Sequence, residues 1–470
     1  MEIVQDQNVN FGRLLRKQRV ADGGPYRLLT YCVSLSVDAG LLVYNTLSCE
    51  MVLLQGDEVR DILSLPYLVE HWFLVPQNFD DRKLARQYRH IHALIAPKGK
   101  YINNYTILTT TDCNARCFYC YEMGRSRIPM SEETAEKVAG YIKNNHANDA
   151  RHRGQNLTWF GGEPLYNYKA IDLICSRLKE SDVPFHSIMI SNGYLLSPEL
   201  VERAKTLWNL IKIQITLDGT EEVYNRSKSF VYREGSAFQR VMRNIGLLLD
   251  AGILVYVRLN MDLYNSDDLM SLAHLLAETF PGRKGLFVYC SPLFEAAAGK
   301  RSSKRTEEGR QEIYLKQRKL TALLERLGLG NQRQNGVDRD IRNQHCMADS
   351  QHSVVIAPTG DLGLCEHYSD DNFFSHIDTP EVRDENVMRS FSERCEDLDI
   401  CDDCAIYPQC IRLKKCEEGS LCSAMKKLQR NDLFKMRMMI SFKRWNKKRN
   451  YETEVPILDQ PSAGEICGCA

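Results

Sequence analysis

The sequence predicts an α/β fold with a parallel sheet, preceded by a small α+β unit and followed by a cysteine-rich segment. Three observations support this. Apolar runs typical of strands alternate with helical patterns in six repeats from 105 to 290. Short alternating apolar runs precede them within 26–95. Six of the 17 cysteines crowd into 395–422, a density typical of metal-binding segments.

The central repeats define the sheet. Because strand–helix–strand units cross over with a right hand, their strands lie parallel and their carboxyl ends share one edge. Functional side chains are expected at that edge. We expect strands at 105–110, 156–160, 185–190, 211–217, 253–260 and 285–290. We expect helices at 131–146, 168–180, 197–208, 236–251 and 266–279.

The N-terminal part reads as a separate unit. Residues 1–25 are polar, and we expect a loose lead-in there. Three strands are expected at 32–37, 41–44 and 49–54, and three helices at 57–63, 65–73 and 80–94. Three strands with three helices fit a winged helix-turn-helix.

Charged residues fill 295–345, and we expect a bridging helix and a solvated loop there. A basic, helix-like stretch at 424–449 follows the cysteines, and the tail with Cys467 and Cys469 is expected to fray. The predicted domains are 1–100, 101–295, 296–345, 346–425 and 426–470.

Composition excludes several classes of protein. Lysines with arginines number 61, as do aspartates with glutamates, so the net charge is zero. This balance argues against broad nucleic-acid or membrane-surface binding. No apolar run approaches the ~18 residues of a membrane span, and the polar, acidic start does not resemble a secretory signal. Many cysteines without such a signal favour a cytoplasmic protein that binds metal.

The most informative motif is Cys113-x3-Cys117-x2-Cys120, which directly follows the first strand of the repeats. Three thiolates on one loop are able to bind three irons of a four-iron cluster, and no fourth cysteine lies in the loop. The fourth iron is then open to a ligand. A zinc knuckle and buried structural thiols are the alternatives, although zinc usually recruits paired Cys-x2-Cys or Cys/His sets.

The motif resembles Cys-x3-Cys-x-aromatic-Cys of the radical S-adenosylmethionine (SAM) superfamily. The resemblance implies a partial (β/α)6 barrel, a [4Fe-4S] cluster whose open iron chelates SAM, and a 5′-deoxyadenosyl radical that abstracts hydrogen from the substrate. It also implies an electron donor of the flavodoxin or ferredoxin type.

Further residues match this family at the ends of successive strands. The resemblance implies that Gly162 lets the backbone approach SAM and that Glu163 pairs with the methionine amino group. It also implies that Tyr119 packs near the adenine and that Ser191 and Asn192 lie near the ribose. Asp218 ends the fourth strand, and either Arg226 or Lys228 would approach the methionine carboxylate, with Arg226 chosen here. Of Arg258 and Asn260 on the fifth strand, we expect one to face the cavity, and we choose Arg258. For each polar residue, a capping or turn role is the alternative.

The second group of cysteines resembles the SPASM domain, which holds two auxiliary [4Fe-4S] clusters. The resemblance assigns Cys401, Cys404, Cys410 and Cys422 to an outer cluster. It assigns Cys346, Cys365 and Cys416 to an inner cluster, whose fourth ligand is Cys290, Cys395 or none. The family has x3 where this chain has x5 between Cys410 and Cys416. Zinc ribbons are the alternative.

The stretch 44–48, with the apolar residues after it, resembles the front of radical SAM peptide maturases, where such a unit recognises a leader peptide. We therefore predict an enzyme that oxidises a ribosomally made precursor peptide, with a thioether cross-link as the first choice. Carbon–carbon cross-linking, epimerisation and sulfatase-type formylglycine formation are enzymatic alternatives. Glu366 is either a general base or a surface carboxylate. The non-enzymatic alternative is an iron–sulfur regulator that binds DNA through the winged helix.

Overall fold

The computed structural model describes residues 1–15, 24–95, 101–122, 124, 126–232, 235–293, 306–330, 335–342, 344–350, 352–368, 372–416 and 422–448. Residues 300–305 of the charged segment and the cysteines at 467 and 469 lie outside these residues. Across the described part of the chain, no helix combines the length and the apolar character needed to cross a membrane.

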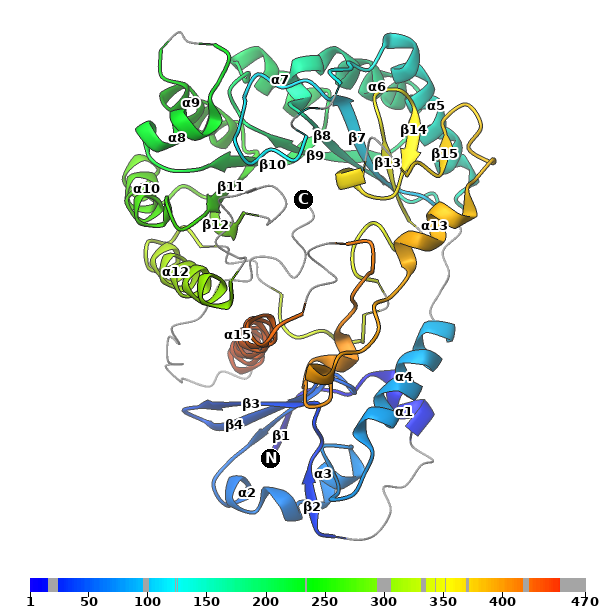
Figure 1. Ribbon diagram of the computed structural model, residues 1–470, viewed down its shortest axis with the longest axis vertical. Coiled ribbons are helices and arrows are strands. Elements are labelled where there is room, and N and C mark those ends of the chain that lie inside the picture. Colours follow the sequence, from blue (N-terminus) through cyan, green and yellow to red (C-terminus); the bar gives the residue numbers. More distant parts are fainter. Residues whose placement is uncertain are drawn as a thin grey trace.

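A parallel sheet forms the centre of the upper part of the molecule (Figure 1). The six predicted strands pair in sequence order, each parallel to the next. Their bounds are β7 (Asn104–Thr110), β8 (Gln155–Gly161), β9 (Phe185–Ser191), β10 (Leu210–Leu217), β11 (Leu254–Met261) and β12 (Leu286–Pro292). The predicted α/β fold with a parallel sheet is therefore confirmed.

Helices cover the outer face of this sheet, near their predicted positions (Figure 1). Several begin at serine caps, because Ser131, Ser197 and Ser236 each accept a hydrogen bond from a backbone N–H of the first turn. The helices are α5 (Glu132–Asn148), α6 (Tyr168–Glu180), α7 (Pro198–Thr206), α8 (Glu221–Lys228), α9 (Ala237–Asp250) and α10 (Ser266–Thr279).

Alternation along the strands separates the core from the barrel interior. On β10, Ile213, Ile215 and Leu217 join the buried apolar cluster shared with the helices. The residues between them are polar and face the other side. Gln214 there accepts a hydrogen bond from Tyr289 on β12 at 2.6 Å. The inner wall is therefore polar, as a site for a polar ligand requires.

Three short strands extend the sheet beyond β7 (Figure 1). β13 (Ser353–Ile356) pairs parallel with β7, and β14 (Asp361–Gly363) and β15 (Ser375–His376) follow antiparallel. Short helical turns η5 (Glu366–Tyr368), η6 (Asp399–Cys401) and η7 (Tyr407–Gln409) and the helix α13 (Glu385–Ser392) lie in the same segment. The second group of cysteines is therefore joined to the barrel by a continuous sheet.

The N-terminal unit contains a four-stranded sheet in the order β1-β5-β4-β3. The bounds are β1 (Glu2–Gln5), β2 (Tyr26–Leu28), β3 (Cys32–Val37), β4 (Gly40–Asn45), β5 (Glu50–Leu54) and β6 (Leu74–Pro76). The helices are α1 (Val9–Leu15), α2 (Asp57–Arg60), η1 (Ile62–Ser64), α3 (Pro66–Glu70) and α4 (Asp81–Ile95).

The expected loose lead-in is wrong for residues 1–15. β1 pairs antiparallel with β5, and the Phe11 side chain of α1 is fully buried. The polar composition of this segment did not indicate its packing, because a single buried aromatic residue anchors the helix. The Phe11 ring packs edge-to-face against Tyr88 of α4.

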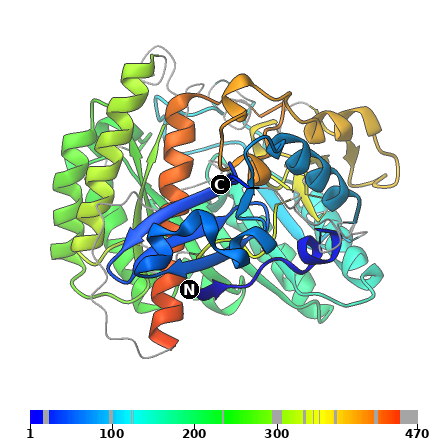
Figure 2. The ribbon, with the colours of Figure 1, turned by 90° about the horizontal axis from the view of Figure 1, so that it is seen from below.

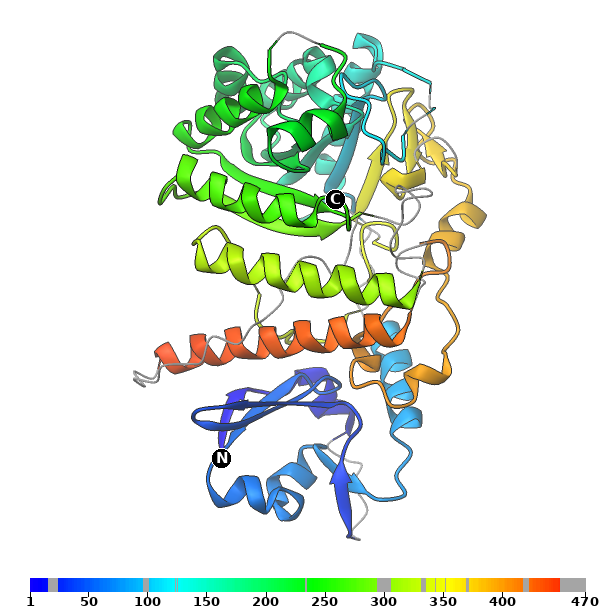
Figure 3. The same cartoon turned by 60° about the vertical axis from the view of Figure 1, so that its left-hand side comes forward.

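Two long helices separate the barrel from the N-terminal unit. α12 (Glu307–Arg326) packs on β12 and α10, and α15 (Ala424–Lys448) packs on β3 and β1. Figure 3 shows α12 and α15 stacked between the two units, and Figure 2 shows α15 crossing the N-terminal sheet. α12 fulfils the expected bridging helix.

The N-terminal unit and the cysteine-rich segment share one apolar core. Tyr407, Phe434 and Met438 belong to the same buried cluster as Tyr44 and Leu53. The Gln409 amide donates to the Tyr44 hydroxyl and to the carbonyl of Thr46, both at 2.9 Å. The unit is thus packed into the rest of the protein rather than tethered to it.

Candidate active site

The cysteine loop lies at the carboxyl edge of the parallel sheet and is fastened to the neighbouring strand. The amide of Gly162 donates to the carbonyl of Thr110 at 3.0 Å, and the amide of Glu163 donates to the carbonyl of Asp112 at 2.9 Å. From the other side, the Arg116 amide donates to the carbonyl of Lys228 at 2.8 Å. These bonds fix the loop between β8 and α8.

Two glycines make this close approach possible. A Cβ on Gly161 would lie 2.2 Å from the Thr110 carbonyl oxygen, and Gly161 has φ of +119°, where other residues are strained. A Cβ on Gly162 would lie 2.3 Å from the carbonyl oxygen of Asp112. The Gly-Gly pair therefore allows the backbone of β8 to contact the cysteine loop.

The loop carries three thiols, Cys113, Cys117 and Cys120. Burial raises the pKa of Cys113 to about 12, and the charges of Cys117 and Cys120 raise it further. Burial also raises the pKa of Cys120 to about 11, and the charge of Cys117 adds to it. Burial likewise raises the pKa of Cys117. The Ala115 amide donates to the Cys113 sulfur at 3.3 Å. All three are unbridged, so they are available as soft ligands.

Glu163 is a buried carboxyl group beside this loop. Its Oε1 accepts a hydrogen bond from the Ser191 hydroxyl at 2.8 Å, and its Oε2 accepts one from the Asn192 amide at 2.8 Å. Burial raises the pKa of Glu163 to about 7, in opposition to these bonds. The Asn192 side-chain amide donates a hydrogen bond to the side-chain oxygen of Asn114, in the cysteine loop, at 2.7 Å. Four of the predicted residues, Gly162, Glu163, Ser191 and Asn192, thus meet beside Cys113.

A second polar network lies next to it. The Tyr119 hydroxyl donates to Asp218 at 2.7 Å, and the Lys228 ammonium donates to Tyr119 at 2.7 Å and lies 3.3 Å from Asp218. Lys228 also donates to Thr216, and Asn260 donates to Asp218 at 3.0 Å. Burial lowers the pKa of Lys228, but Asp218, Cys117 and Cys113 together outweigh burial, so that the pKa is raised. The buried cation is therefore paired and stays charged.

The structure brings Lys228, and not the predicted Arg226, to this network. The Arg226 side chain is 71% exposed and lies 3.9 Å from Glu222 on the outside of α8, whereas the Lys228 side chain is 3% exposed and faces Asp218. Arg226 lies two residues, about 200° around the helix, from Lys228. Helical phase, had α8 been recognised, would have separated the two.

The expectation for β11 also needs correction. Residues two apart on a strand project from the same face, so Arg258 and Asn260 lie on one side of β11, and both are buried. The Arg258 guanidinium donates to Ser291 at 2.9 Å, and Asn260 donates to the Tyr119 hydroxyl at 3.1 Å. Asn260 and Thr216 are site residues that the prediction left out, and strand alternation would have found them.

Residues 107–276 match the family model of the radical SAM superfamily. This match spans the strands and loops that carry the site. The chain carries a radical SAM domain.

Curated relatives of this domain are distant. Radical SAM cyclopropyl synthase TigE of Paramaledivibacter caminithermalis is 22% identical over 268 residues, which cover 47% of this chain and 55% of TigE. GTP 3′,8-cyclase of Clostridium perfringens is 24% identical over 319 residues, which cover 63% of this chain and 92% of the cyclase. The chain spans about half the length of TigE and of the probable GTP 3′,8-cyclase of Methanosarcina mazei.

Solved structures share the fold at low identity. The anSMEcpe structure with bound AdoMet aligns with a TM-score of 0.52 and 15% identity, covering 73% of this chain and 95% of its own. Streptococcus suis SuiB bound to S-adenosylmethionine aligns with a TM-score of 0.51 and 12% identity, covering 85% of this chain and 99% of its own. This chain therefore shares its fold with two proteins whose structures contain bound SAM.

Beyond the radical SAM domain, the cysteines form two further groups. Burial raises the pKa of Cys422, and the charges of Cys410 and Cys401 raise it further. Burial also raises the pKa of Cys404, and the charges of Cys410 and Cys422 raise it further. The structure thus gathers Cys401, Cys404, Cys410 and Cys422. In the same way, burial raises the pKa of Cys365, and the charges of Cys346 and Cys416 raise it further.

The sulfurs in these groups, like those of the Cys113–Cys117–Cys120 loop, are not drawn around a single point. Among the residues that the structure describes, no three His, Cys, Asp or Glu side chains are placed to hold one metal ion. The charge effects between the sulfurs show that they lie near one another. Binding one metal ion requires more, because the sulfurs must also converge on a common point. Proximity alone defines an outer set (Cys401, Cys404, Cys410, Cys422) and an inner set (Cys346, Cys365, Cys416).

The two cysteines considered as an extra inner ligand lie elsewhere. Cys290 belongs to the apolar core on the outer face of β12, where its sulfur lies 3.7 Å from that of Met261. Cys395 lines a cavity together with Cys401 and Cys410 of the outer set. The structure therefore does not bring Cys290 to the inner set.

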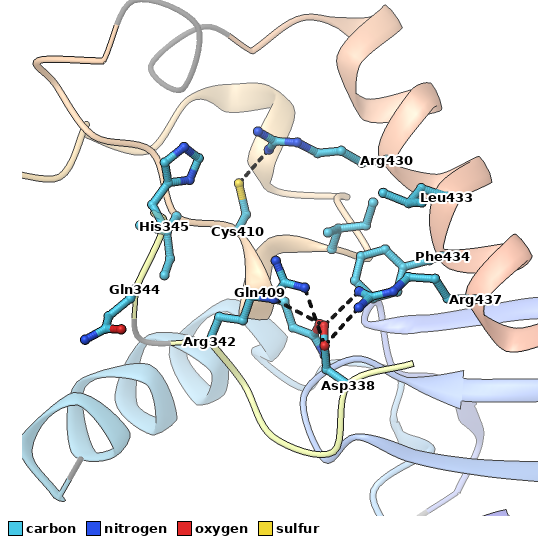
Figure 4. A pocket seen from close by; sticks show the side chains of 12 residues that line it. Asp338, Arg342, Gln344, His345, Gln409, Cys410, Arg430, Leu433, Phe434 and Arg437 are labelled. Atoms are coloured by element: carbon cyan, nitrogen blue, oxygen red, sulfur yellow. Dashed lines mark hydrogen bonds and ion pairs between the residues drawn. The ribbon is translucent and has the colours of Figure 1, made fainter. Parts of the chain in front are cut away.

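The outer set has an arginine beside it that the sequence motifs did not single out. Figure 4 shows Arg430 of α15 pointing at Cys410, and its guanidinium donates to the Cys410 sulfur at 2.7 Å. The same pocket is lined by Arg342 and Arg437, which both bind Asp338. The signal in the sequence was faint, because α15 carries many basic residues.

Glu366 is buried, with 2% of its surface exposed. The alternative of a surface carboxylate is therefore wrong. Glu366 adjoins Cys365 in the η5 turn, and the ring of the next residue, His367, stacks on Tyr121 at 4.5 Å. Tyr121 directly follows Cys120, so η5 lies against the loop of the radical SAM domain.

Proposed function

We propose that this protein is a radical SAM enzyme that oxidatively modifies a ribosomally synthesised precursor peptide. The observation that carries the proposal is the attachment of the Cys113–Cys117–Cys120 loop to Glu163 and Asn192 at the carboxyl edge of the sheet. A [4Fe-4S] cluster on this loop, with SAM, supplies hydrogen-atom abstraction from an unactivated carbon.

The residues present fit such a group. Three unbridged thiols on one loop are suitable iron ligands, and backbone N–H donation to Cys113 suits an electron-rich sulfur. We propose that Glu163 accepts a hydrogen bond from the amino group of SAM and that Lys228 pairs with its carboxylate. Tyr119 and Asp218 hold Lys228 in position. Enclosure by the barrel excludes water from these ion pairs and strengthens them.

The outer and inner cysteine sets support an oxidative outcome. We propose that they hold two auxiliary [4Fe-4S] clusters, which accept the electron that a substrate radical must lose to become a closed-shell product. Glu366 is proposed as the base that removes a proton from the substrate, because it is buried between the inner set and the cysteine loop.

Relatives support a peptide as the substrate. Native anSMEcpe with bound AdoMet and Kp18Cys peptide aligns with this chain with a TM-score of 0.51 and 13% identity. In addition, β3 is the end strand of the N-terminal sheet, and an extended leader is able to add to such an edge. We therefore propose leader binding at the N-terminal unit.

The alternative of a DNA-binding regulator loses its support. The basic side chains of α4 turn towards the cysteine-rich segment, where Arg82 lies 3.0 Å from Asp397 and Arg89 donates to the carbonyl of Cys410 at 2.9 Å. A recognition helix must present its basic face to the groove. Here Arg82 and Arg89 of that face bind the cysteine-rich segment instead.

The test is anaerobic co-expression with a small cysteine-containing precursor peptide encoded nearby, followed by mass spectrometry. Loss of two hydrogens per modification, with a thioether located by fragmentation, is the expected result. An unchanged mass with altered stereochemistry points to epimerisation. An unmodified peptide from the iron-loaded protein contradicts the proposal.

The role of Glu366 has its own test. The Glu366→Gln variant is expected to form 5′-deoxyadenosine from SAM while yielding at least about 100-fold less modified peptide, in the range that a general base contributes. Equal loss of both products contradicts a role as base and indicates a structural one.

A further inference from the structure

Strands β10, β11 and β12 present a row of half-buried side chains on the inner face of the barrel. The Tyr256 and Phe287 rings lie with their centroids 5.0 Å apart at a tilt of 36°, and the Tyr289 hydroxyl donates to Gln214 at 2.6 Å. All four residues are partly exposed, whereas the residues between them on each strand enter the apolar core. The proposed SAM site uses none of these four. A wall of aromatic and polar groups is a surface that suits a substrate.

Lys212 lies at the amino end of this wall. Because residues two apart on a strand share a face, Lys212 projects from β10 to the same side as Gln214. Its ammonium nitrogen lies 5.1 Å from the centroid of the Tyr256 ring. The residues paired with Lys212 on the two neighbouring strands, Ile188 and Leu254, are both apolar. The wall therefore ends in a cation that lies beside an aromatic ring and between two apolar neighbours.

Lys212 pairs with no carboxylate among the residues that the structure describes. Burial lowers the pKa of Lys212, and burial is the one cause of that shift. Lys228 in the same barrel differs, because Asp218 lies 3.3 Å from its ammonium and the pKa of Lys228 is raised. A half-buried ammonium loses part of its hydration, and here no anion of the protein replaces it. A carboxylate supplied by a ligand would restore the lost interaction.

The separation of Lys212 from the SAM site determines which part of a peptide reaches it. Thr216 lies four residues further along β10 on the same face, and it accepts a hydrogen bond from Lys228. At ~3.3 Å per residue, Lys212 lies about 13 Å from Thr216 along the strand. An extended peptide advances by about the same distance in four residues. A side chain about four positions from the attacked residue is therefore able to reach Lys212.

We propose that Lys212 is a specificity-determining residue that pairs with an Asp or Glu side chain in the core of the precursor peptide. This acidic residue lies about four positions from the residue that is attacked, and the residues between them pack on Tyr256 and Phe287. The Lys212 ammonium donates to the carboxylate in a charge-assisted hydrogen bond. The inference rests on the proposed function, because it takes a peptide as the substrate.

The first experiment measures the binding of two synthetic peptides to the full chain, reconstituted with iron and sulfide, in the presence of SAM. The probes are acetyl-Cys-Gly-Ala-Gly-Glu-amide and the same peptide with Gln in place of Glu, and calorimetry gives both affinities. We expect the wild type to bind the Glu peptide about tenfold more tightly, the effect of one charge-assisted hydrogen bond. Lys212→Met is expected to bind both peptides equally.

The matched control is Lys205→Met, which makes the same charge change on α7, outside the barrel. It is expected to prefer the Glu peptide as the wild type does. Denaturant unfolding shows whether Lys212→Met folds normally. We expect its midpoint to be unchanged or higher, because the substitution removes a half-buried charge that has no partner.

The second experiment uses the precursor peptide that the co-expression experiment identifies. Replacing the acidic residue about four positions from the attacked one with its amide is expected to lower kcat/KM about tenfold in the wild type. The same replacement is expected to have little effect in Lys212→Met. Lys212→Glu is expected to recover activity with a peptide that carries Lys at this position. A merely structural role for Lys212 would not produce such an exchange of charges.

Equal affinity of the wild type for the Glu and Gln peptides would overturn the proposal, as would a preference for Glu that persists in Lys212→Met. A precursor without an acidic residue at this distance, or one that tolerates its replacement, would overturn it too. Failure of the proposed function gives a different result. The wild type then modifies no precursor peptide, while its preference for the Glu peptide still depends on Lys212.

Discussion

The guanidinium of Arg430 donates a hydrogen bond to the sulfur of Cys410 at 2.7 Å, across the gap between α15 and the cysteine-rich segment (Figure 4). A positive charge and an N–H on a ligand sulfur stabilise the reduced form of an iron–sulfur cluster more than the oxidised form. Arg430 also acts on Cys422, whose pKa it lowers against burial. One residue of α15 thus acts on two members of the outer set.

We expect Arg430→Gln to lower the reduction potential of one auxiliary cluster. A tenfold change in its equilibrium with a one-electron donor corresponds to about 59 mV, and we expect a shift of about this size. Potentiometry monitored by electron paramagnetic resonance checks it. Lys435→Gln, the same charge change on the same helix, is the control. An unchanged potential in Arg430→Gln contradicts a cluster at Cys410.

Lys228 and Arg226 offer a matched pair on one helix. Lys228→Met leaves the buried carboxylate of Asp218 without its cation, which costs about 3 to 5 kcal/mol in the free energy of unfolding. Arg226→Gln changes an exposed side chain and is expected to stay within about 0.5 kcal/mol. Denaturant unfolding measures both.

SAM binding to the same two variants follows from this placement. Lys228→Met is expected to bind SAM weakly, and Arg226→Gln is expected to bind as the wild type does. If Arg226→Gln abolished SAM binding and Lys228→Met did not, the assignment of Lys228 would be wrong.

Glu163 gives SAM binding a pH dependence. Its pKa is raised by burial to about 7, and the ionised form is the one that accepts from the SAM amino group. Because the folded pKa is raised, the carboxyl is mostly protonated at pH 6 and mostly ionised at pH 8. Affinity is therefore expected to rise about tenfold over this interval.

The control for this dependence is Glu163→Gln, which has no charge to gain. It should bind more weakly and lose this rise, as measured by calorimetry. A wild-type affinity that falls between pH 6 and pH 8, or an equal rise in the variant, would show that another group titrates.

The contact between β8 and the cysteine loop is tested with a methyl group. Gly162→Ala places a Cβ 2.3 Å from the Asp112 carbonyl oxygen and is expected to cost on the order of 1 to 3 kcal/mol, with loss of iron from the loop. Gly140→Ala, in α5, has open space around it and is expected to stabilise by about 0.5 to 1 kcal/mol. Thermal unfolding and iron analysis distinguish the two.

Periodicity predicted the barrel well, because its strands and helices each bury one regular face. All six strands appear within a few residues of their expected bounds. The short elements β1 and α1 were missed, since polar residues surround the few that anchor them. β13 was missed for another reason: its pairing with β7 joins residues about 250 positions apart, which local patterns do not report.

At the site, motifs predicted residues whose role depends on their position along the backbone, such as the cysteines and Gly162. Motifs were less informative where the direction of the side chain determines whether a residue reaches the site. Lys228 and Arg226 project from different sides of α8. Cys290 and Ser291 project from opposite faces of β12, so that Cys290 enters the apolar core while Ser291 binds Arg258. Arg430 lies on a different element from Cys410, and no motif links them.

The most direct test adds SAM to the anaerobically reconstituted, dithionite-reduced protein. We expect the electron paramagnetic resonance spectrum to change on addition, and 5′-deoxyadenosine to form. The Cys113→Ala/Cys117→Ala/Cys120→Ala variant should show neither, whereas Cys401→Ala/Cys404→Ala should retain some uncoupled formation. An iron-replete wild type with an unchanged spectrum, or a triple variant that still makes 5′-deoxyadenosine, would contradict the account.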